Sequence, residues 1–286
     1  MEFIPALPKR SRESHKGDYG HLFILGGSPG LTGAVCMAGR AAMRSGCGLV
    51  TVGVPASLNG IIEEKLTETM SKPLAETPDH TIAPAAGREI VPFLEAKADA
   101  VVLGPGISLQ KETFRFIREI LPVIRKPLVL DADALKAVGG MSSLVKSIKG
   151  PVIFTPHPGE MAALSGKTTE EIRRDREGTA RACAKTYAAV VILKGDRSLV
   201  TDGSRLYENL TGNPGMATAG MGDVLAGILG AFLARGMSAF EAAILGVYLH
   251  GLAGDFAAQD VGEESLTAGD VIETLPEAFS FHLNSG

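Results

Sequence analysis

The chain has 286 residues, of which 45% are hydrophobic and 21% are charged, so it is not a disordered protein and is long enough to bury a large core. Its net charge is −4, aromatic residues make up 5% and Trp is absent, which argues against a nucleic-acid-binding or anionic-membrane-binding surface. The 35 glycines suit tight turns at which the backbone approaches phosphate.

The cysteines and the apolar segments indicate where the protein works. Cys36, Cys47 and Cys183 lie far apart and form no CxxC or Cys/His metal pattern, so we interpret them as buried thiols in a reducing compartment. The N-terminal segment MEFIPALPKRSRES lacks the apolar core of a signal peptide. Polar residues around Arg235 interrupt the apolar stretch 224–253, which predicts two buried helices. We expect a cytoplasmic protein that does not enter a membrane.

Short apolar runs alternate with helical segments along the chain. The runs are continuous, which is typical of strands covered by helices on both faces. Repeated strand–helix alternation predicts a mostly parallel sheet with right-handed crossovers. The predicted strands are residues 21–25, 49–54, 100–103, 127–130, 152–155 and 190–193, and the predicted helices include residues 34–44, 112–124 and 169–186.

The last strands differ from the others, because segments 198–200 and 206–208 flank a DGSR turn and predict a hairpin. We find no internal repeat and no linker. The sequence therefore predicts one α/β domain over residues 1–286, with a mostly parallel central sheet and helices on both faces.

Unusual residues follow the predicted strands directly. The motifs GGSPG, GPG, DAD, PHPGE and KGD each begin where an apolar run ends. In open α/β sheets, ligands bind beyond the carboxyl ends of the strands. We therefore expect these motifs to form a single site.

The most informative segment is 212–227, GNPGMATAGMGDVLAG, in which a glycine-rich loop runs into an apolar helix that begins near Asp223. The backbone N–H groups at Gly220, Met221 and Gly222 are predicted to form an anion hole, because the first amides of a helix have no partner within it. A carboxylate beside an anion repels it, unless the carboxylate takes a proton from an attacking hydroxyl. The alternative is that Asp223 is simply the N-cap of the helix.

Two residues of the PHPGE motif also have two interpretations. His157, between two prolines, is either a turn residue or a substrate contact, and we favour contact over proton transfer. Glu160 either helps to hold a hydrated Mg²⁺ through water or provides a carboxylate at the start of the next helix.

Three charged residues that follow other strands also have two interpretations each. Lys194 is either a point charge for a phosphate or a solvated surface lysine. Asp131 and Asp133 are either an N-cap and a helix-start carboxylate or residues close to a metal ion.

Taken together, these motifs resemble a known family. The order and spacing of HKGDYGHLFILGGSPGLTGA, GPGI, LDADAL, TPHPGE, LKGDRS and GNPGMATAGMGDVLAG are similar to those of the ADP/ATP-dependent NAD(P)H-hydrate dehydratases, over nearly the whole chain. The resemblance implies a ribokinase-like fold. It also implies dehydration of the S-epimer of hydrated NADH or NADPH, with ADP or ATP as phosphate donor and Mg²⁺ as cofactor.

The resemblance also implies residue roles, with Asp223 as catalytic base. The residues expected to contact the hydrated nicotinamide nucleotide are Ala34, Gly106, His157 and Asp223. Those expected to bind the donor nucleotide are Lys194, Gly195, Asp196, Arg197, Ser198 and Gly222. Ala219, Met221 and Ser198 depart from the residues usual in the family, from which we expect altered affinity and retained activity.

The remaining expectations concern partners and alternatives. The resemblance implies a homo-oligomer, with a tetramer as one form, and a separate hydrate epimerase, because the first strand begins too early for an epimerase domain. It favours ADP without deciding between ADP and ATP, and leaves the NADH or NADPH preference open. The alternatives are a kinase of a small hydroxylated metabolite, such as a thiazole or pyrimidine alcohol, and a nucleotide sensor for which Asp223 is dispensable. A Rossmann dehydrogenase has weak support, because GxGxxG is absent.

Overall fold

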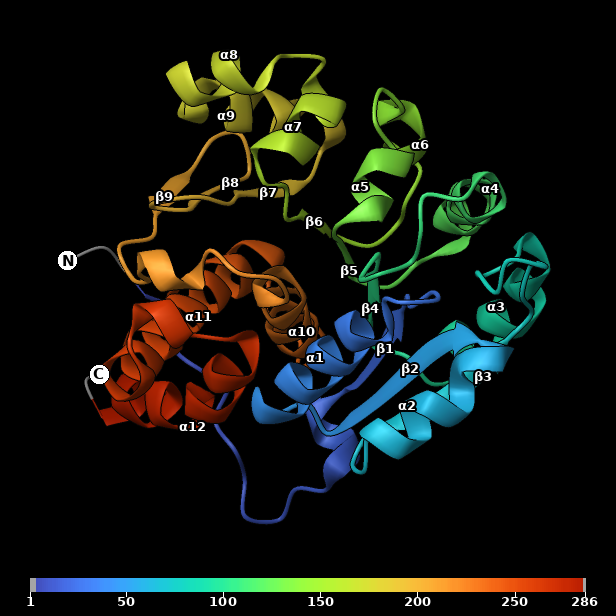
Figure 1. The fold of residues 1–286 in the computed structure, drawn as a ribbon, viewed down its shortest axis with the longest axis horizontal. Coiled ribbons are helices and arrows are strands. Elements are labelled where there is room, and N and C mark those ends of the chain that lie inside the picture. Colours follow the sequence, from blue (N-terminus) through green and yellow to red (C-terminus); the bar gives the residue numbers. More distant parts are fainter. Residues whose placement is uncertain (1–3, 285–286) are drawn as a thin grey trace.

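A computed structural model describes residues 4–284; residues 1–3 and 285–286, which the expected domain includes, lie outside the described residues. Nine strands of this part of the chain form one sheet in the order β3-β2-β1-β4-β5-β6-β7-β8-β9 (Figure 1). Strands β1 to β7 pair in parallel, and β7, β8 and β9 pair antiparallel. The structure confirms the predicted α/β class, the mostly parallel sheet and the hairpin.

The elements follow the predicted order. The strands are β1 (His21–Leu25), β2 (Leu49–Pro55), β3 (Met70–Leu74), β4 (Ala100–Leu103), β5 (Leu128–Leu130), β6 (Val152–Phe154), β7 (Val190–Leu193), β8 (Leu199–Thr201) and β9 (Leu206–Glu208). The helices are α1 (Thr32–Arg44), α2 (Asn59–Lys65), α3 (Gly87–Ala96), α4 (Lys111–Ile120), α5 (Asp133–Ala137), α6 (Ser142–Lys146), α7 (Pro158–Ser165), α8 (Thr169–Arg174), α9 (Arg176–Tyr187), α10 (Met221–Ala234), α11 (Ala239–Val261) and α12 (Ala268–Asn284).

Strand β3 is missing from the sequence prediction. It lies at the edge of the sheet, pairs with β2 and has mostly exposed or half-buried side chains. Lys72 and Pro73 interrupt its apolar character, and both residue types are tolerated where one side of a strand has no partner. An edge strand therefore lacks the continuous apolar run that identified the inner strands.

Two predicted helices have different ends in the structure. The helix expected at 169–186 breaks at Asp175, whose side chain accepts a hydrogen bond from the Gly178 N–H at 2.9 Å and so starts α9. The helix expected at 112–124 ends at Ile120 and continues as a 3₁₀ turn over Leu121–Val123. The turn contains Pro122, which cannot donate the hydrogen bond that an α-helix requires there.

The apolar stretch 224–253 forms two helices, as predicted. Arg235 caps the end of α10, and Ser238 caps the start of α11. Within the described residues, no helix is long and apolar enough to cross a membrane.

The cysteines are buried free thiols, as predicted. Burial raises the pKa of Cys47 to about 11 and that of Cys183 to about 12. Both thiols therefore remain protonated and unreactive at neutral pH.

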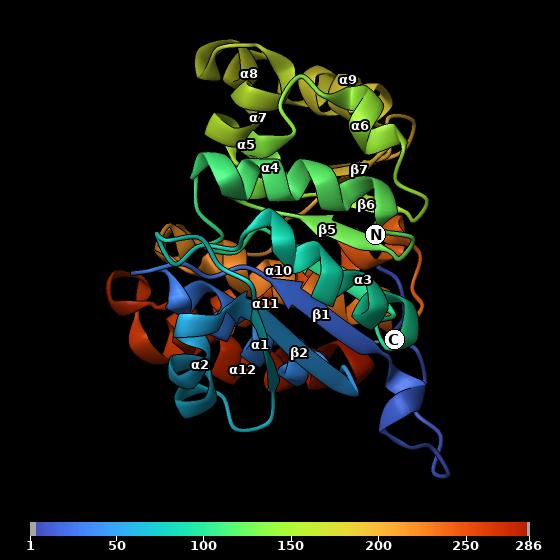
Figure 2. The ribbon, with the colours of Figure 1, turned by 90° about the vertical axis from the view of Figure 1, so that its right-hand side faces the viewer.

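Helices cover both faces of the sheet, and successive residues of each inner strand contribute to opposite faces (Figures 1 and 2). In β1, Leu22 and Ile24 pack in a buried cluster with α1, α10, α11 and α12. Phe23 and Leu25 pack in a second cluster with α3, α4 and the helices as far as α9. Burial on both faces explains why the inner strands are continuous apolar runs.

The register of the sheet aligns the ends of its central strands. Leu25 pairs with Leu103, Leu103 with Leu130, and Leu130 with Phe154. The loops after β1, β4, β5 and β6 therefore leave the sheet at one level. Strand β1 lies between β2 and β4, so the direction in which strands are added reverses beside it, and such a reversal opens a crevice for ligands.

Helix α10 lies close to its neighbours because two of its residues lack side chains. A Cβ on Gly227 would collide with the backbone carbonyl of Ala38 in α1, and a Cβ on Gly230 would lie 2.5 Å from Val102 Cγ2 in β4. The two glycines thus fix the position of α10 against α1 and the sheet. This matters because the N-terminus of α10 belongs to the predicted anion hole.

Gly227→Ala is expected to lower the free energy of unfolding by about 1–3 kcal/mol, because the methyl group must displace a packed backbone. Gly60→Ala in α2 is the control, since a Cβ there meets nothing within 4 Å. It should leave stability unchanged or raise it. Chemical denaturation of the two variants tests the difference, and equal stabilities would contradict the proposed tight contact.

Candidate functional site

The N-terminus of α10 presents free backbone amides. Gly220 precedes the helix with φ 93°, and a Cβ there would lie 2.5 Å from Met37 Sδ. The helix begins at Met221, two residues before the predicted start, and its first hydrogen bond runs from the Val224 N–H to the Gly220 carbonyl at 3.0 Å. The N–H groups of residues 221–223 therefore have no partner within the helix and can bind an anion.

Asp223 is the third residue of α10, so its interpretation as N-cap is wrong; Gly220 occupies that position. Burial, together with the negative charges of Asp131 and Glu160, raises the pKa of Asp223 to about 7, although the Lys194 ammonium acts in the opposite direction. No side chain in the described part of the chain forms a hydrogen bond or ion pair with Asp223. Its carboxylate is therefore able to accept a proton near neutral pH.

Lys194 is paired with buried acids, so its interpretation as a solvated surface lysine is wrong. Its Nζ lies 3.3 Å from Asp131 Oδ1 and 3.8 Å from Glu160 Oε2, and its side chain is 21% exposed. Burial lowers the pKa of Lys194, but the attraction of Asp131, Glu160 and Asp223 outweighs it and raises the pKa overall. A Cβ on Gly222 would lie 3.2 Å from Nζ, so this positive charge sits against the N-terminus of α10.

Asp131 is held below the site. It is 1% exposed, accepts a hydrogen bond from Thr155 Oγ1 at 2.5 Å and pairs with Lys194. Its interpretation as N-cap is wrong, because Ala132 holds that position of α5 with φ 50°, a strained conformation for a residue with a Cβ. Asp133 is the first residue of α5, as expected for a helix-start carboxylate.

His157 and Glu160 cap α7 together. The His157 Nδ1 accepts hydrogen bonds from the N–H groups of Gly159 at 3.0 Å and Glu160 at 3.3 Å. In return, Glu160 Oε2 accepts one from the His157 N–H at 2.9 Å. Glu160 therefore has the helix-start position that one interpretation gave it. The imidazole, whose Nε2 lies 3.4 Å from Glu160 Oε1, remains half exposed.

Ala34 and Gly106 lie together beside β1 and β4. A Cβ on Gly106 would lie 3.1 Å from Ala34 Cβ, and Ser28 Oγ donates a hydrogen bond to the Gly106 carbonyl at 2.8 Å. The Gly27 N–H donates to the Pro105 carbonyl at 2.9 Å. The two glycine motifs after β1 and β4 thus form one packed unit, as the parallel register predicts.

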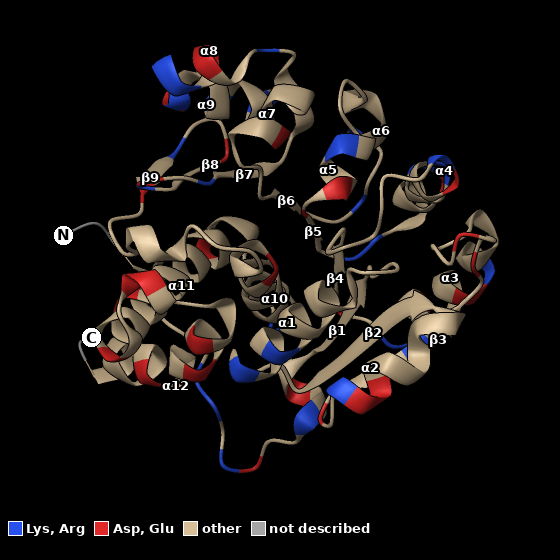
Figure 3. Ribbon diagram, in the orientation of Figure 1, with Lys and Arg blue, Asp and Glu red and all other residues tan. Residues whose placement is uncertain are grey.

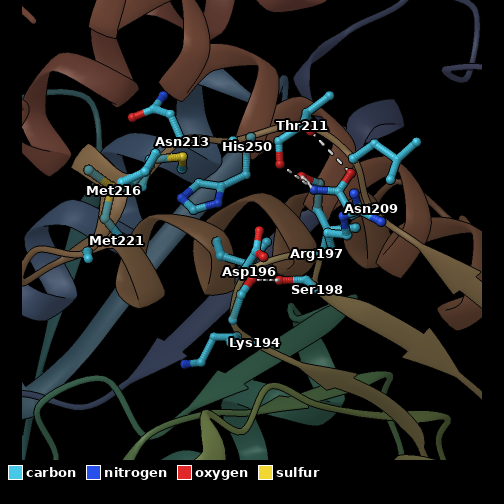
Figure 4. A pocket seen from close by; sticks show the side chains of 18 of the residues that line it. Lys194, Asp196, Arg197, Ser198, Asn209, Thr211, Asn213, Met216, Met221 and His250 are labelled. Carbon is cyan, nitrogen blue, oxygen red and sulfur yellow. Dashed lines mark hydrogen bonds between the residues drawn. The ribbon is translucent and has the colours of Figure 1, made fainter. Parts of the chain in front are cut away.

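A cavity of about 540 Å³ adjoins the start of α10 (Figure 4). It is lined by all six residues expected to bind the donor nucleotide and by Met221, whereas Ala34, Gly106, His157 and Asp223 lie outside it. Six further lining residues belong to the segment 212–227 but had no individual role assigned: Gly212, Asn213, Pro214, Met216, Ala217 and Leu225. The sequence analysis missed the other six, which are Asn209, Leu210, Thr211, Val247, His250 and Gly251. The size of the cavity and its mixed polar and apolar wall suit a small ligand.

Arg176, the first residue of α9, was also missed. Its guanidinium donates to the carbonyls of Asp196 at 2.5 Å, Arg197 at 3.1 Å and Leu193 at 3.4 Å. Residues 195 and 197 have positive φ values, 148° and 51°. The arginine therefore holds a strained loop in the cavity wall, and only the fold brings it there from 17–21 residues away.

The described residues contain no cluster of three or more His, Cys, Asp or Glu side chains arranged to hold a metal ion. Asp131 and Glu160, the two acidic side chains beside Lys194, both pair with its ammonium group. Basic and acidic residues occur together on α2, α4 and α8 (Figure 3). The arrangement provides a proton acceptor, a buried cation and free amides at one helix end, which together suit transfer of a phosphoryl group.

Comparison with protein families gives a match to the model of the NAD(P)H-hydrate dehydratase family over residues 22–277. The bifunctional NAD(P)H-hydrate repair enzyme Nnr of Moorella thermoacetica is 46% identical over 275 residues, which are 94% of this chain and 51% of that protein. The chain thus spans about half the length of this relative. The ADP-dependent (S)-NAD(P)H-hydrate dehydratase of Neisseria meningitidis serogroup B is 35% identical, over 95% of this chain and 88% of that protein.

Solved structures share the fold. The ADP/ATP-dependent NAD(P)H-hydrate dehydratase of Bacillus subtilis, co-crystallised with ATP and Mg²⁺, has a TM-score of 0.83 and 29% identity. The match covers 96% of this chain and 94% of that one. The predicted ribokinase-like fold is confirmed, since the structural neighbours include a protein of that superfamily.

Asp223→Asn is expected to stabilise the protein at pH 8 and to have little effect at pH 4. Between its ordinary pKa of 3.8 and a pKa of about 7, the folded carboxyl binds more protons than the unfolded one, so stability falls as the pH rises. The amide removes this loss. Thermal unfolding of the wild type and Asp223→Asn across this range measures it, with the exposed Asp260→Asn as control. A difference in Tm that does not change with pH would contradict the raised pKa.

Proposed function

The chain belongs to the NAD(P)H-hydrate dehydratase family, and on that premise we propose that it restores hydrated NADH and NADPH to the intact cofactors. The substrate is the S-epimer of the hydrate, and ADP or ATP is the phosphate donor, with AMP or ADP and phosphate as products. One observation carries the proposal: Asp223, a carboxyl group with a pKa of about 7, directly follows Met221 and Gly222, which begin α10 and line a cavity of nucleotide size.

In the first step, Asp223 takes the proton of the ring hydroxyl while the hydroxyl oxygen attacks the terminal phosphorus of the nucleotide. A new O–P bond forms, and the bond from phosphorus to the leaving AMP or ADP breaks. The amides of residues 221–223 donate hydrogen bonds to the phosphoryl oxygens, and Lys194 supplies positive charge from below.

In the second step, the substrate itself completes the reaction. Hydroxide is a poor leaving group, whereas phosphate is a good one. The lone pair of the ring nitrogen expels the phosphate, and transfer of a proton from the neighbouring carbon to the released phosphate or to water restores the dihydropyridine. Ala34, Gly106 and His157 hold the hydrated nucleotide on the other side of Asp223, in keeping with the packing of the loops after β1 and β4.

Mg²⁺ is part of this proposal as a companion of the nucleotide. Bound to the phosphates, it would neutralise charge on the transferred group. The described residues offer no cluster of metal ligands, so phosphate and water oxygens would supply most of the coordination and Glu160 would contribute through water.

The second candidate is a ribokinase-like kinase of a small hydroxylated metabolite, since it needs the same base and anion hole. The two functions differ in the fate of the phosphate ester. A kinase releases it, whereas the dehydratase eliminates phosphate from it.

Further parts of the proposal rest on the family. We treat residues 1–286 as one ribokinase-like domain that works in the cytoplasm as a homo-oligomer. A hydrate epimerase works alongside it in converting the other epimer, and the bifunctional relatives make this functional pairing reasonable.

The decisive assay mixes the purified protein with hydrated NADH, Mg²⁺ and either ADP or ATP. Return of the reduced-nicotinamide absorbance with one donor identifies the activity and its donor. Asp223→Asn should lose about 10²–10³ in kcat, while Asp260→Asn should retain the rate of the wild type. Absence of turnover with both donors, or full activity of Asp223→Asn, would contradict the assignment.

Arg176→Met is expected to raise the KM for the donor nucleotide by about 5- to 30-fold, because residues 194–198 lose the side chain that holds their carbonyls. The KM for the hydrate should change little. Arg176→Lys, which keeps the charge but not the planar fork, should lie between. The exposed Arg173→Met serves as control. Equal changes in the two KM values would indicate general loss of structure and contradict a positioning role.

A further inference from the structure

His250 is the unexplained polar residue of the nucleotide cavity. It lies in the middle of α11, an apolar helix packed against α10 and α12, where its neighbours in sequence are Leu249 and Gly251. Its imidazole projects into the cavity between Met221 and Asp196 (Figure 4). A histidine here is not needed to fill the core, because the adjoining cavity wall is built from apolar residues such as Val247 and Leu225.

The ring is neutral at physiological pH. Burial and, to a smaller extent, the Lys194 ammonium lower the pKa of His250 to about 4. A hydrogen bond to the backbone of Met221 acts in the opposite direction, as it does when the ring is the donor. A neutral imidazole has one N–H and one bare nitrogen. With the proton on Nδ1, Nε2 is the acceptor.

Nε2 of His250 is one of three buried side-chain nitrogen or oxygen atoms without a hydrogen bond in the described part of the chain. The other two belong to Asn59 and Arg235, which do not line this cavity. Burying an acceptor without a partner is unfavourable, so the ligand of the cavity is the natural source of the missing donor.

The position of the ring indicates which part of a nucleotide it meets. In the proposed function, the phosphates bind at the amides of Met221 and Gly222, and Met221 also lies beside His250. The ring therefore lies next to the phosphate end of the nucleotide, where the nucleoside begins. Phosphate oxygens only accept hydrogen bonds, so a bare imidazole nitrogen has no use for them. The neutral donors of an adenine nucleoside are the two sugar hydroxyls and the exocyclic amine.

We propose that His250 is a specificity-determining residue, whose Nε2 accepts a hydrogen bond from a donor on the nucleoside part of the phosphate-donor nucleotide. This rests on the proposed function, because it assumes that the cavity binds ADP or ATP. It goes beyond that function in assigning an individual contact to α11. It also explains a buried polar atom that the catalytic steps do not use.

The test combines protein variants with nucleotide analogues. Isothermal titration calorimetry measures the Kd of each nucleotide for each protein, in the absence of the hydrated substrate. His250→Phe keeps a ring and removes the acceptor, and His250→Gln restores one. His282→Phe on α12 makes the same exchange outside the cavity. The probes are ADP and three analogues. 2′-Deoxy-ADP and 3′-deoxy-ADP each lack one sugar hydroxyl, and inosine diphosphate lacks the exocyclic amine.

We expect His250→Phe to weaken ADP binding about 5- to 30-fold, with partial recovery in His250→Gln and no change in His282→Phe. One analogue should bind the wild type more weakly by a similar factor and should bind His250→Phe as well as ADP does. That analogue identifies the donor group. Such coupling separates a direct contact from a structural role, because a cavity distorted in His250→Phe would weaken the binding of every probe by a similar factor.

Other outcomes overturn the inference. If a folded His250→Phe binds ADP as tightly as the wild type, or if every analogue loses the same factor in both proteins, His250 makes no such contact. Failure of the wild type to bind either ADP or ATP contradicts the nucleotide-dependent function itself, and the inference with it. Binding of ADP without coupling at His250 leaves the proposed function standing and overturns only this inference.

Discussion

The electrostatics of the site depend on how the buried ammonium group of Lys194 interacts with three acidic side chains. Lys194 lies closest to Asp131 and Glu160, and its field reaches Asp223 only as a third, weaker attraction. Because the cation is already engaged, burial and the neighbouring acids outweigh it at Asp223 and raise the pKa of that carboxyl. A lysine free of Asp131 would stabilise ionised Asp223 and make it a weaker base. The buried pair therefore keeps a positive charge beneath the anion hole without tying up the proton acceptor.

The fold maintains this arrangement through register and close packing. The aligned ends of β1, β4, β5 and β6 bring Asp131 from one loop and the PHPGE motif from the next to the same level. Lys194 enters from β7, with its N–H donating to the Pro156 carbonyl at 2.9 Å. Gly227 and Gly230 let α10 descend onto α1 and the sheet, so the free amides arrive beside Lys194. A shift of α10 by the width of a methyl group would move these amides away from the Lys194 ammonium.

The sequence predicted what local pattern determines and missed what long-range packing determines. Continuous apolar runs identified the inner strands. The KGDRS motif after β7 and the glycine-rich segment before α10 identified much of the cavity wall, whereas the motifs after β1, β4, β5 and β6 lie outside it. The edge strand β3 was not predicted, since half of its surface faces solvent. Asp131 resembles an N-cap in sequence, and only the positions of Thr155 and Lys194 show that it is a buried partner. Arg176 and His250 approach the site from helices whose local sequence carries no ligand motif.

The raised pKa of Asp223 bears on the choice between the dehydratase and the kinase. In both reactions the aspartate gains a proton when the hydroxyl attacks phosphorus. With a pKa near 4 it would ionise again at once and place a negative charge beside the new phosphate ester, which favours release of that ester. With a pKa of about 7 a larger fraction of the carboxyl is protonated at neutral pH, and a neutral carboxyl does not repel phosphate and can donate a hydrogen bond to it. A kinase gains from rapid release, whereas the proposed dehydratase must hold the ester until the ring nitrogen expels phosphate. A raised pKa of Asp223 is therefore compatible with a site that retains the phosphate ester until phosphate is eliminated.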